Sequence, residues 1–253
     1  PASDIDMVTN VLLENGKVAG VDRGLSPADA EVIDARGLIV CPGLIDAHVH
    51  LREPGNEGAE TIATGTAAAV AGGFASVACM PNTTPALDDE TGIEFIYRQT
   101  DREGRCNVYP VGAVTKERRG EQLAEIGQMV RAGAVGFSDD GQGVESTAVI
   151  FRALQYLRMF DKPVMQHCED SSLVHGGVMN GGKTAIRLGL PGINPVAEDL
   201  MLQRDLTLVE QTRARYHVCH VSTARAVDLV RQAKSAGLPV TCEVCPNHLL
   251  LTE

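Results

Sequence analysis

From residue 43 onward, short apolar runs alternate with helix-length stretches, and this alternation constrains the fold more than any other feature of the sequence. Strictly alternating strands and helices imply a parallel sheet, because parallel neighbours are joined by crossovers of helix length. The predicted strands are residues 43–49, 74–80, 107–114, 134–137, 163–168, 215–221 and 239–244. The predicted helices are residues 61–71, 92–99, 121–132, 146–160, 197–213 and 223–236.

These strands and helices favour an α/β fold, a TIM-like (β/α)8 barrel that lacks its last strand. An open doubly wound sheet is the alternative, but no glycine-rich phosphate loop follows the first strand. We therefore expect an incomplete barrel over residues 42–253. Because the chain also begins without an initiator Met, it is either part of a longer protein or a truncated product.

The first 41 residues have a different sequence pattern from the rest, with short strand-like runs and no helix-length stretches between them. Strand-like runs occur at 8–13, 17–21 and 31–34, and an Asn-Gly pair at 15–16 gives a turn signal between the first two. We expect residues 1–41 to form a partial small β domain.

Charge, hydropathy and cysteine usage indicate which partners and which cellular compartment suit the protein. A formal net charge of -11 argues against nucleic acid and an anionic membrane surface as partners. No apolar stretch approaches the roughly 20 residues of a membrane span. The seven cysteines include Cys79, Cys168, Cys219 and Cys242 within apolar runs, as is usual for buried thiols in a reducing compartment. We expect a cytoplasmic protein.

Histidine and aspartate follow the predicted strands where a barrel carries its chemistry, at the carboxyl ends. His48 and His50 are two residues apart on the first strand, so both side chains point to the same side. Further polar residues at or near the ends of the fourth, fifth and sixth strands are Asp139, Asp140, His167 and His220, and the sixth strand also carries His217. One such histidine is ordinarily explained as a core residue, but several at one barrel mouth are not. Imidazole and carboxylate without thiolate suit zinc or another borderline divalent ion.

Two further residues at these ends suit an anionic or amide substrate. Arg52 follows His50 on the same side and can pair a carboxylate through both prongs of its guanidinium. Asn82 follows the second strand and offers both a donor and an acceptor, although a turn residue after Pro81 would also explain it.

At this point the motifs resemble a known family, the bacterial-type (class I) dihydroorotases of the amidohydrolase superfamily. The resemblance extends from about residue 4 to the end of the chain. It rests on residues 42–55 (PGLIDAHVHLREPG), 80–83 (MPNT), 137–141 (FSDDG), 167–170 (HCED), 217–223 (HVCHVST) and 245–249 (CPNHL). Cyclic amidohydrolases in general share the first motif, whereas the Asp-Asp-Gly motif is more particular to bacterial-type dihydroorotases.

The resemblance implies a metal-dependent hydrolase barrel that holds one or two Zn²⁺ ions. It implies that the enzyme interconverts N-carbamoyl-L-aspartate and L-dihydroorotate in pyrimidine biosynthesis. The implied metal ligands are His48 and His50 for the more buried ion, His167 and His220 for the other, and Asp140, or else Asp139, between them. Arg52 and Asn82 would hold the substrate carboxylate, while His217 and His248 receive no role.

The family's catalytic carboxylate belongs to an Asp-His-Ala-Pro-like motif on the eighth strand, and this sequence has no such motif. We therefore expect the catalytic Asp beyond Glu253 and poor activity from this chain. The resemblance suggests two protein partners, a second copy of the chain and aspartate carbamoyltransferase.

Two other functions compete with dihydroorotase. The first is a catalytically inactive relative that acts as a scaffold for aspartate carbamoyltransferase, but such relatives usually lose the histidines. The second is a hydantoinase or allantoinase, which usually has a carboxylated lysine near the end of strand four. Residues 136–140 contain no Lys, and this favours dihydroorotase.

Overall fold

The computed structural model describes residues 5–25, 29–174 and 176–251. The chain divides into two compact units, Pro1–Pro42 and Gly43–Glu253. Within the described residues, none of the helices is long and apolar enough to cross a membrane. All seven cysteines are free, and Cys79, Cys168 and Cys219 are buried. Cys242 was expected to be buried but is exposed, at the end of an outer strand of its sheet.

The first unit contains one β-hairpin. Strand β1 (Val11–Glu14) pairs antiparallel with β2 (Lys17–Val21). Asn15 and Gly16 connect the strands with φ angles of 51° and 73°, the left-handed conformation that two-residue hairpin turns require. The Asn-Gly signal in the sequence therefore predicted this turn.

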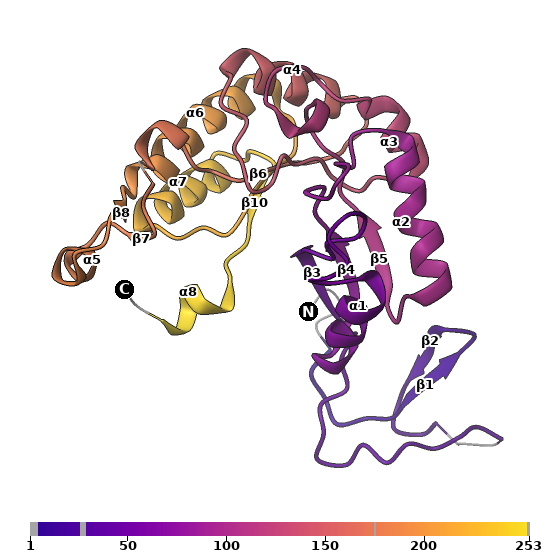
Figure 1. The fold of residues 1–253 in the computed structure, drawn as a ribbon. Helices are drawn as coiled ribbons and strands as arrows, with labels where there is room; N and C mark the ends of the chain where they lie inside the picture. Colours follow the sequence, from indigo (N-terminus) through magenta and orange to yellow (C-terminus); the bar gives the residue numbers. More distant parts are fainter. Residues whose placement is uncertain (1–4, 26–28, 175, 252–253) are drawn as a thin grey trace. The chain divides into compact units, whose positions relative to one another are not determined.

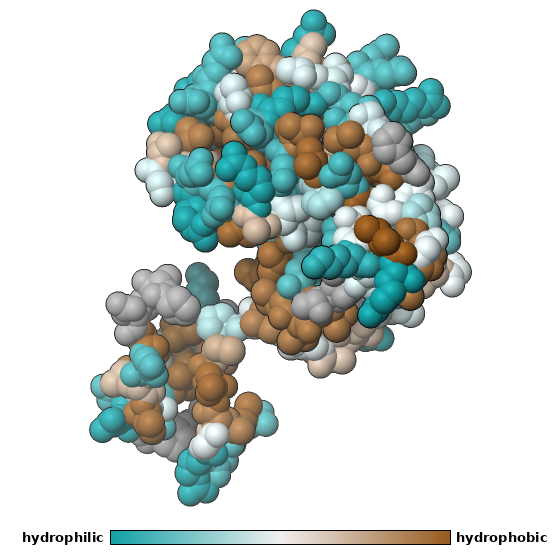
Figure 2. All heavy atoms as spheres, turned by 90° about the vertical axis from the view of Figure 1, so that its left-hand side faces the viewer, coloured by the Kyte–Doolittle hydropathy of each residue, from teal (hydrophilic) through white to brown (hydrophobic). Residues whose placement is uncertain are grey.

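The predicted strand at residues 31–34 is wrong. The segment is irregular, and the Asp34 carboxylate instead closes a local turn by accepting hydrogen bonds from the backbone N–H and the guanidinium of Arg36. Ile33 is 84% exposed, so this apolar run has no buried face in the described residues. Figure 2 shows such hydrophobic side chains at the surface beside hydrophilic ones. An apolar run without a pairing partner or a covered face does not become a strand.

The second unit is an α/β fold of parallel strands, and most of its helices lie on the outer side of these strands (Figure 1). The first sheet has the order β3-β4-β5 and the second has the order β6-β9-β10. Their bounds are β3 (Leu44–Val49), β4 (Phe74–Cys79), β5 (Asn107–Pro110), β6 (Val164–Gln166), β9 (Tyr216–Val218) and β10 (Val240–Cys242). In the described part of the chain β3 and β10 do not pair, so the sheet is open there.

The predicted fourth strand, 134–137, is reduced to one bridging residue. Phe137 bridges in parallel to Gly112 on one side and to Val164 on the other, and so it joins the two sheets. Turns precede and follow this segment. The Ala134 N–H donates to Met129 O at the end of the preceding helix, and the chain turns again where Gln142 N–H donates to Asp139 O.

The helices lie at the predicted positions, but α2 extends four residues beyond its predicted end at 99 and α3 starts later than predicted. They are α1 (Ile62–Ala71), α2 (Glu90–Glu103), α3 (Ile126–Ala132), α4 (Thr147–Arg158), α6 (Val196–Thr212) and α7 (Ala224–Ser235). The prediction began α3 at residue 121, but Leu123 instead bridges antiparallel to Thr115. Side chains accept hydrogen bonds from the first turn at four N-caps, Thr61, Asp89, Ser146 and Thr223.

Short elements complete the unit. The excursion between β6 and α6 contains η2 (Ser171–Leu173), β7 (Met179–Asn180), α5 (Lys183–Leu188) and β8 (Gly192–Ile193). The turn η1 (Lys116–Arg118) follows β5, and α8 (Pro246–Leu250) follows β10. The core lies between strands and helices and includes Ile62, Ile93, Met129, Ile150, Leu154 and Leu202. This packing holds the carboxyl ends of the strands in place.

Candidate metal centre

His48 lies in β3 and His50 directly follows it, and both rings turn toward Asp140. Their ring centroids are 5.2 Å apart. His48 Nε2 lies 3.3 Å from Asp140 Oδ1, and His50 Nε2 lies 3.6 Å from Asp140 Oδ2. His50 Nδ1 is within 3.0 Å of Asn82 Oδ1. The two rings thus approach one carboxylate with their Nε2 atoms.

His167 and His220 approach the same carboxylate from the second sheet. His167 directly follows β6, and its Nδ1 lies 3.5 Å from Asp140 Oδ1. His220 follows β9, and its Nε2 lies 3.7 Å from the same oxygen. The two imidazoles are 3.0 Å apart between His167 Nδ1 and His220 Nε2. His220 has a φ of 36°, a left-handed conformation that is rare outside glycine and is found at functional sites.

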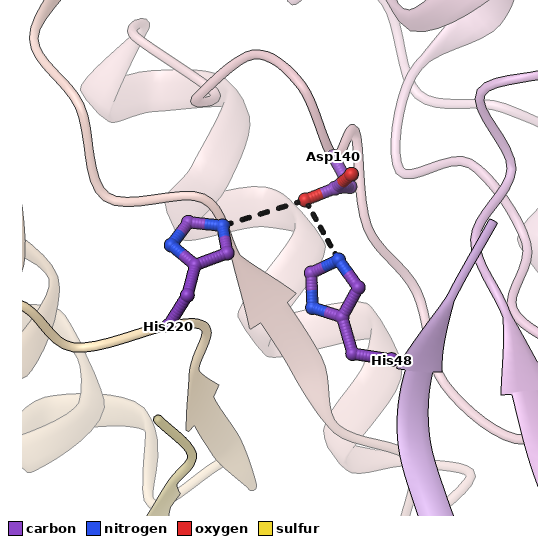
Figure 3. Close-up of side chains that lie close together, drawn as sticks. All are labelled: His48, Asp140 and His220. Carbon is purple, nitrogen blue, oxygen red and sulfur yellow. Dashed lines mark ion pairs between the residues drawn. The ribbon is translucent and has the colours of Figure 1, made fainter. Parts of the chain in front are cut away.

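Asp140 lies at the centre of this group and is 3% exposed. Figure 3 shows its carboxylate between the His48 and His220 rings. Among the described residues its Oδ1 is buried without a hydrogen-bond partner, although three imidazole nitrogens lie within 3.7 Å. His48, Asp140 and His220 can offer one ligand atom each, all within 4.8 Å of one another. A buried carboxylate oxygen without a hydrogen-bond partner, surrounded by imidazole nitrogens, fits a borderline divalent cation.

The electrostatics agree with a cation at this position. Burial opposes the charged form of Asp140, but the imidazoles of His167, His220 and His48 outweigh it and hold the pKa of the carboxyl far below its usual range. Burial likewise opposes protonation of His48, yet Asp140 and Glu243 raise its pKa to about 9. Burial lowers the pKa of His50. The site therefore attracts positive charge, which a metal ion would supply in place of the His48 proton.

Asp139 and Asp140 have different environments, and this separates the two residues that the sequence left as alternatives. The Asp139 carboxylate accepts hydrogen bonds from the backbone N–H groups of Val114 and Thr115, at 2.9 and 3.0 Å, and from the Thr115 hydroxyl. It thereby fastens the segment that follows β5. Asp140, not Asp139, faces the four histidines.

Arg52 and Asn82, the predicted substrate-binding residues, lie beside the histidines. Asn82 contacts His50 and also donates from Nδ2 to Asp140 Oδ2 at 3.4 Å. Arg52 follows β3 with a φ of 61°, and its charge is close enough to His50 to contribute to the lowered pKa of that ring.

Two functional neighbours were missed by the sequence reasoning. Glu243 directly follows β10 and contacts His48, with Nδ1 and Oε1 2.5 Å apart. The rule that polar residues gather at strand ends could have identified it. Arg118 donates from Nη1 to Asp140 O at 2.7 Å. It lies in η1, and no sequence signal marked it.

The two histidines without an assigned role have separate positions. His217 lies in β9, where its Nε2 is 3.2 Å from Glu243 Oε2. His248 lies in α8, where its Nδ1 accepts from the Cys245 N–H at 3.4 Å. Within the residues that the structure describes, His248 takes no part in the contacts around Asp140.

Comparison with known structures identifies the class of the fold. The fold is similar to that of L-hydantoinase (dihydropyrimidinase) from Arthrobacter aurescens, with a TM-score of 0.80 and 25% identity over 96% of this chain and 55% of that chain. D-hydantoinase from Bacillus sp. AR9 is similar with a TM-score of 0.76 and 24% identity, over 95% of this chain and 55% of that chain. The protein therefore has an α/β amidohydrolase fold.

The sequence comparisons narrow the class further. Residues 37–226 match the family model described as dihydro-orotase-like. The chain is 51% identical over 253 residues to the dihydroorotase of Solibacter usitatus and 45% identical over 253 residues to that of Acetivibrio thermocellus. It covers 59% of the length of each of these relatives. The chain belongs to the dihydroorotase-like family.

Proposed function

We propose that this chain supplies the metal centre of a dihydroorotase, which interconverts N-carbamoyl-L-aspartate and L-dihydroorotate in pyrimidine biosynthesis. The observation that carries the proposal is the buried Asp140 carboxylate, whose Oδ1 has no hydrogen-bond partner among the described residues and is surrounded by imidazoles. The 51% identity to a dihydroorotase over the whole chain supports the choice of reaction. The parallel strands with their carboxyl ends around one site support a (β/α)8 barrel of the metal-dependent hydrolase type.

In this proposal one or two zinc ions are held by His48, His50, His167, His220 and Asp140. The metal supplies Lewis-acid activation of water and of the ring amide carbonyl. Arg52 and Asn82 orient the substrate by binding its carboxylate, since a guanidinium pairs with a carboxylate through two hydrogen bonds. Asp140 and Glu243 are both engaged with histidines, so neither is proposed as the base that moves the proton to the ring nitrogen.

The other expectations stay predictions within this proposal. They are poor activity of the chain by itself, a cytoplasmic location, self-association and binding to aspartate carbamoyltransferase. The inactive scaffold is disfavoured by the convergence of all four histidines on Asp140, because loss of catalysis usually accompanies loss of metal ligands.

The decisive experiment is a spectroscopic assay of ring opening by the zinc-loaded chain, and by any longer protein that contains it. Dihydroorotate, hydantoin and allantoin are compared as substrates. We expect turnover of dihydroorotate alone, weak in the chain by itself, abolished by His48→Ala and retained by the control His248→Ala on α8. Bound zinc without turnover of any ring, in the chain and in the longer protein, would replace the enzyme with the scaffold.

A further inference from the structure

The contacts of Glu243 assign it a role that the metal ligands alone do not explain. Its carboxylate lies between two histidines from different strands. Oε1 is 2.5 Å from His48 Nδ1, and Oε2 is 3.2 Å from His217 Nε2. All three side chains are largely covered, with exposures of 19% for Glu243, 11% for His48 and 13% for His217. The Glu243 carboxylate therefore interacts with the two imidazole rings rather than with solvent.

The Glu243 contact determines which nitrogen of His48 faces Asp140. A carboxylate accepts hydrogen bonds, so His48 Nδ1 must carry the proton at 2.5 Å from Glu243. The neutral ring then has its lone pair on Nε2, the atom that lies 3.3 Å from Asp140 Oδ1. Metal-binding histidines typically donate their second ring N–H to such a carboxylate, which fixes the tautomer and the ring orientation.

His217 extends the contact toward the edge of the sheet. Its Nδ1 is 2.8 Å from the Thr241 hydroxyl, and Thr241 is its partner in the register of β9 and β10. The approach of His217 Nε2 to Glu243 is an ion-pair distance without hydrogen-bond alignment. His48 is therefore the primary partner of Glu243, and His217 limits the movement of the second oxygen.

A second metal ion is the competing explanation for this cluster. His48, Cys219 and Glu243 can offer one ligand atom each, all within 4.8 Å of one another. Two ligands on a tetrahedral zinc with bonds of about 2.0–2.1 Å are roughly 3.3 Å apart. The separation of 2.5 Å between His48 Nδ1 and Glu243 Oε1 leaves no room for an ion between them. Cys219, the third member of this group, is 1% exposed.

We propose that Glu243 is a positioning residue that fixes the tautomer and orientation of His48 for metal binding, and that His217 holds its second carboxylate oxygen. This inference rests on the metal centre of the proposed function. Glu243 itself does not bind the ion. A list of the metal ligands alone would omit Glu243, since it acts only through the ring of His48.

The test measures zinc affinity by chelator competition in Glu243→Ala, Glu243→Gln and wild type. We expect binding about 10- to 100-fold weaker in Glu243→Ala. The loss should be smaller in Glu243→Gln, because the amide oxygen still accepts from Nδ1–H. The control is Glu210→Gln, an exposed carboxylate on α6, which should leave the affinity unchanged.

A second measurement distinguishes positioning from a merely structural role. In zinc-loaded protein with ¹⁵N-labelled histidine, the protected Nδ1–H resonance of His48 should be present in wild type and lost in Glu243→Ala. Glu243→Gln, which keeps an acceptor, should retain it. The isosteric Gln side chain also keeps the test usable if the Ala variant does not fold.

The outcomes separate this inference from the proposed function. If wild type binds no zinc, the metal centre itself is wrong. If wild type binds zinc and the folded Glu243 variants bind it equally well with the His48 resonance retained, only the positioning role is wrong. A zinc content that falls by one ion per chain in Cys219→Ser would overturn the inference in favour of a second metal ion.

Discussion

Asp139 and Asp140 are neighbours in sequence, yet their carboxylates serve different parts of the molecule. The Asp139 carboxylate accepts hydrogen bonds from the backbone N–H groups of Val114 and Thr115, whereas the Asp140 carboxylate faces the histidines. The two side chains point to different neighbours where the chain turns, so one stabilises a loop while the other lies among the histidines.

We therefore predict opposite effects of two conservative substitutions. Asp140→Asn should weaken zinc binding by at least about tenfold, because it removes the charge at the centre of the site. Asp139→Asn should instead lower the free energy of unfolding by about 1–3 kcal/mol, because an amide cannot accept all the donors of Val114 and Thr115. Chelator competition and urea unfolding of the metal-free chain measure the two effects. A greater loss of zinc affinity in Asp139→Asn would contradict the assignment.

Zinc binding should release a proton from His48. Burial opposes the protonated form of this ring, but Asp140 and Glu243 raise its pKa to about 9, so the metal-free ring is charged at pH 7.5. A metal ion that takes Nε2 must displace that proton. Titration calorimetry in buffers of different ionisation enthalpy should report release of about one proton at pH 7.5. Heats independent of the buffer would contradict a protonated His48 in the metal-free site.

The stability of the metal-free chain should decrease in acid. Burial opposes the charged form of Glu243, but His217 and His48 outweigh it and lower the pKa to about 2, against 4.5 for the free side chain. A lowered folded-state pKa contributes stability that is present above 4.5 and lost as the pH falls toward 2. We expect a loss on the order of 1–3 kcal/mol over this window. Urea unfolding with chelator present measures it, and Glu243→Gln should flatten the slope.

Tyr216→Phe should destabilise the protein through a buried carboxylate distant from solvent. Asp205 is 0% exposed and accepts hydrogen bonds from the Tyr216 hydroxyl at 2.7 Å and from Gln166 Nε2 at 3.0 Å. Removing one donor leaves the charge partly unsatisfied, which costs about 1–3 kcal/mol. The matched control is Tyr156→Phe, whose residue is 37% exposed on α4. Equal midpoints of thermal unfolding for the two variants would contradict this account.

The sequence predicted the α/β class and the histidines that lie around Asp140. Strands and helices were predictable because burial imposes a local period on apolar residues, and His48 and His50 could be assigned to one side because strand geometry alternates. The irregular segment at 31–34 and the single bridge at Phe137 were not predictable, since pairing depends on partners distant in the chain.

Only the tertiary structure decided which side chains contact one another. The separation of Asp139 from Asp140 depends on the position of Thr115, and the role of Glu243 depends on its contact with His48 across the sheet. The spacing of residues along one strand predicts the side to which each side chain points, because the backbone conformation repeats. The distance between side chains on different strands is set only when the helices pack against the sheets and bring separate segments within hydrogen-bonding range.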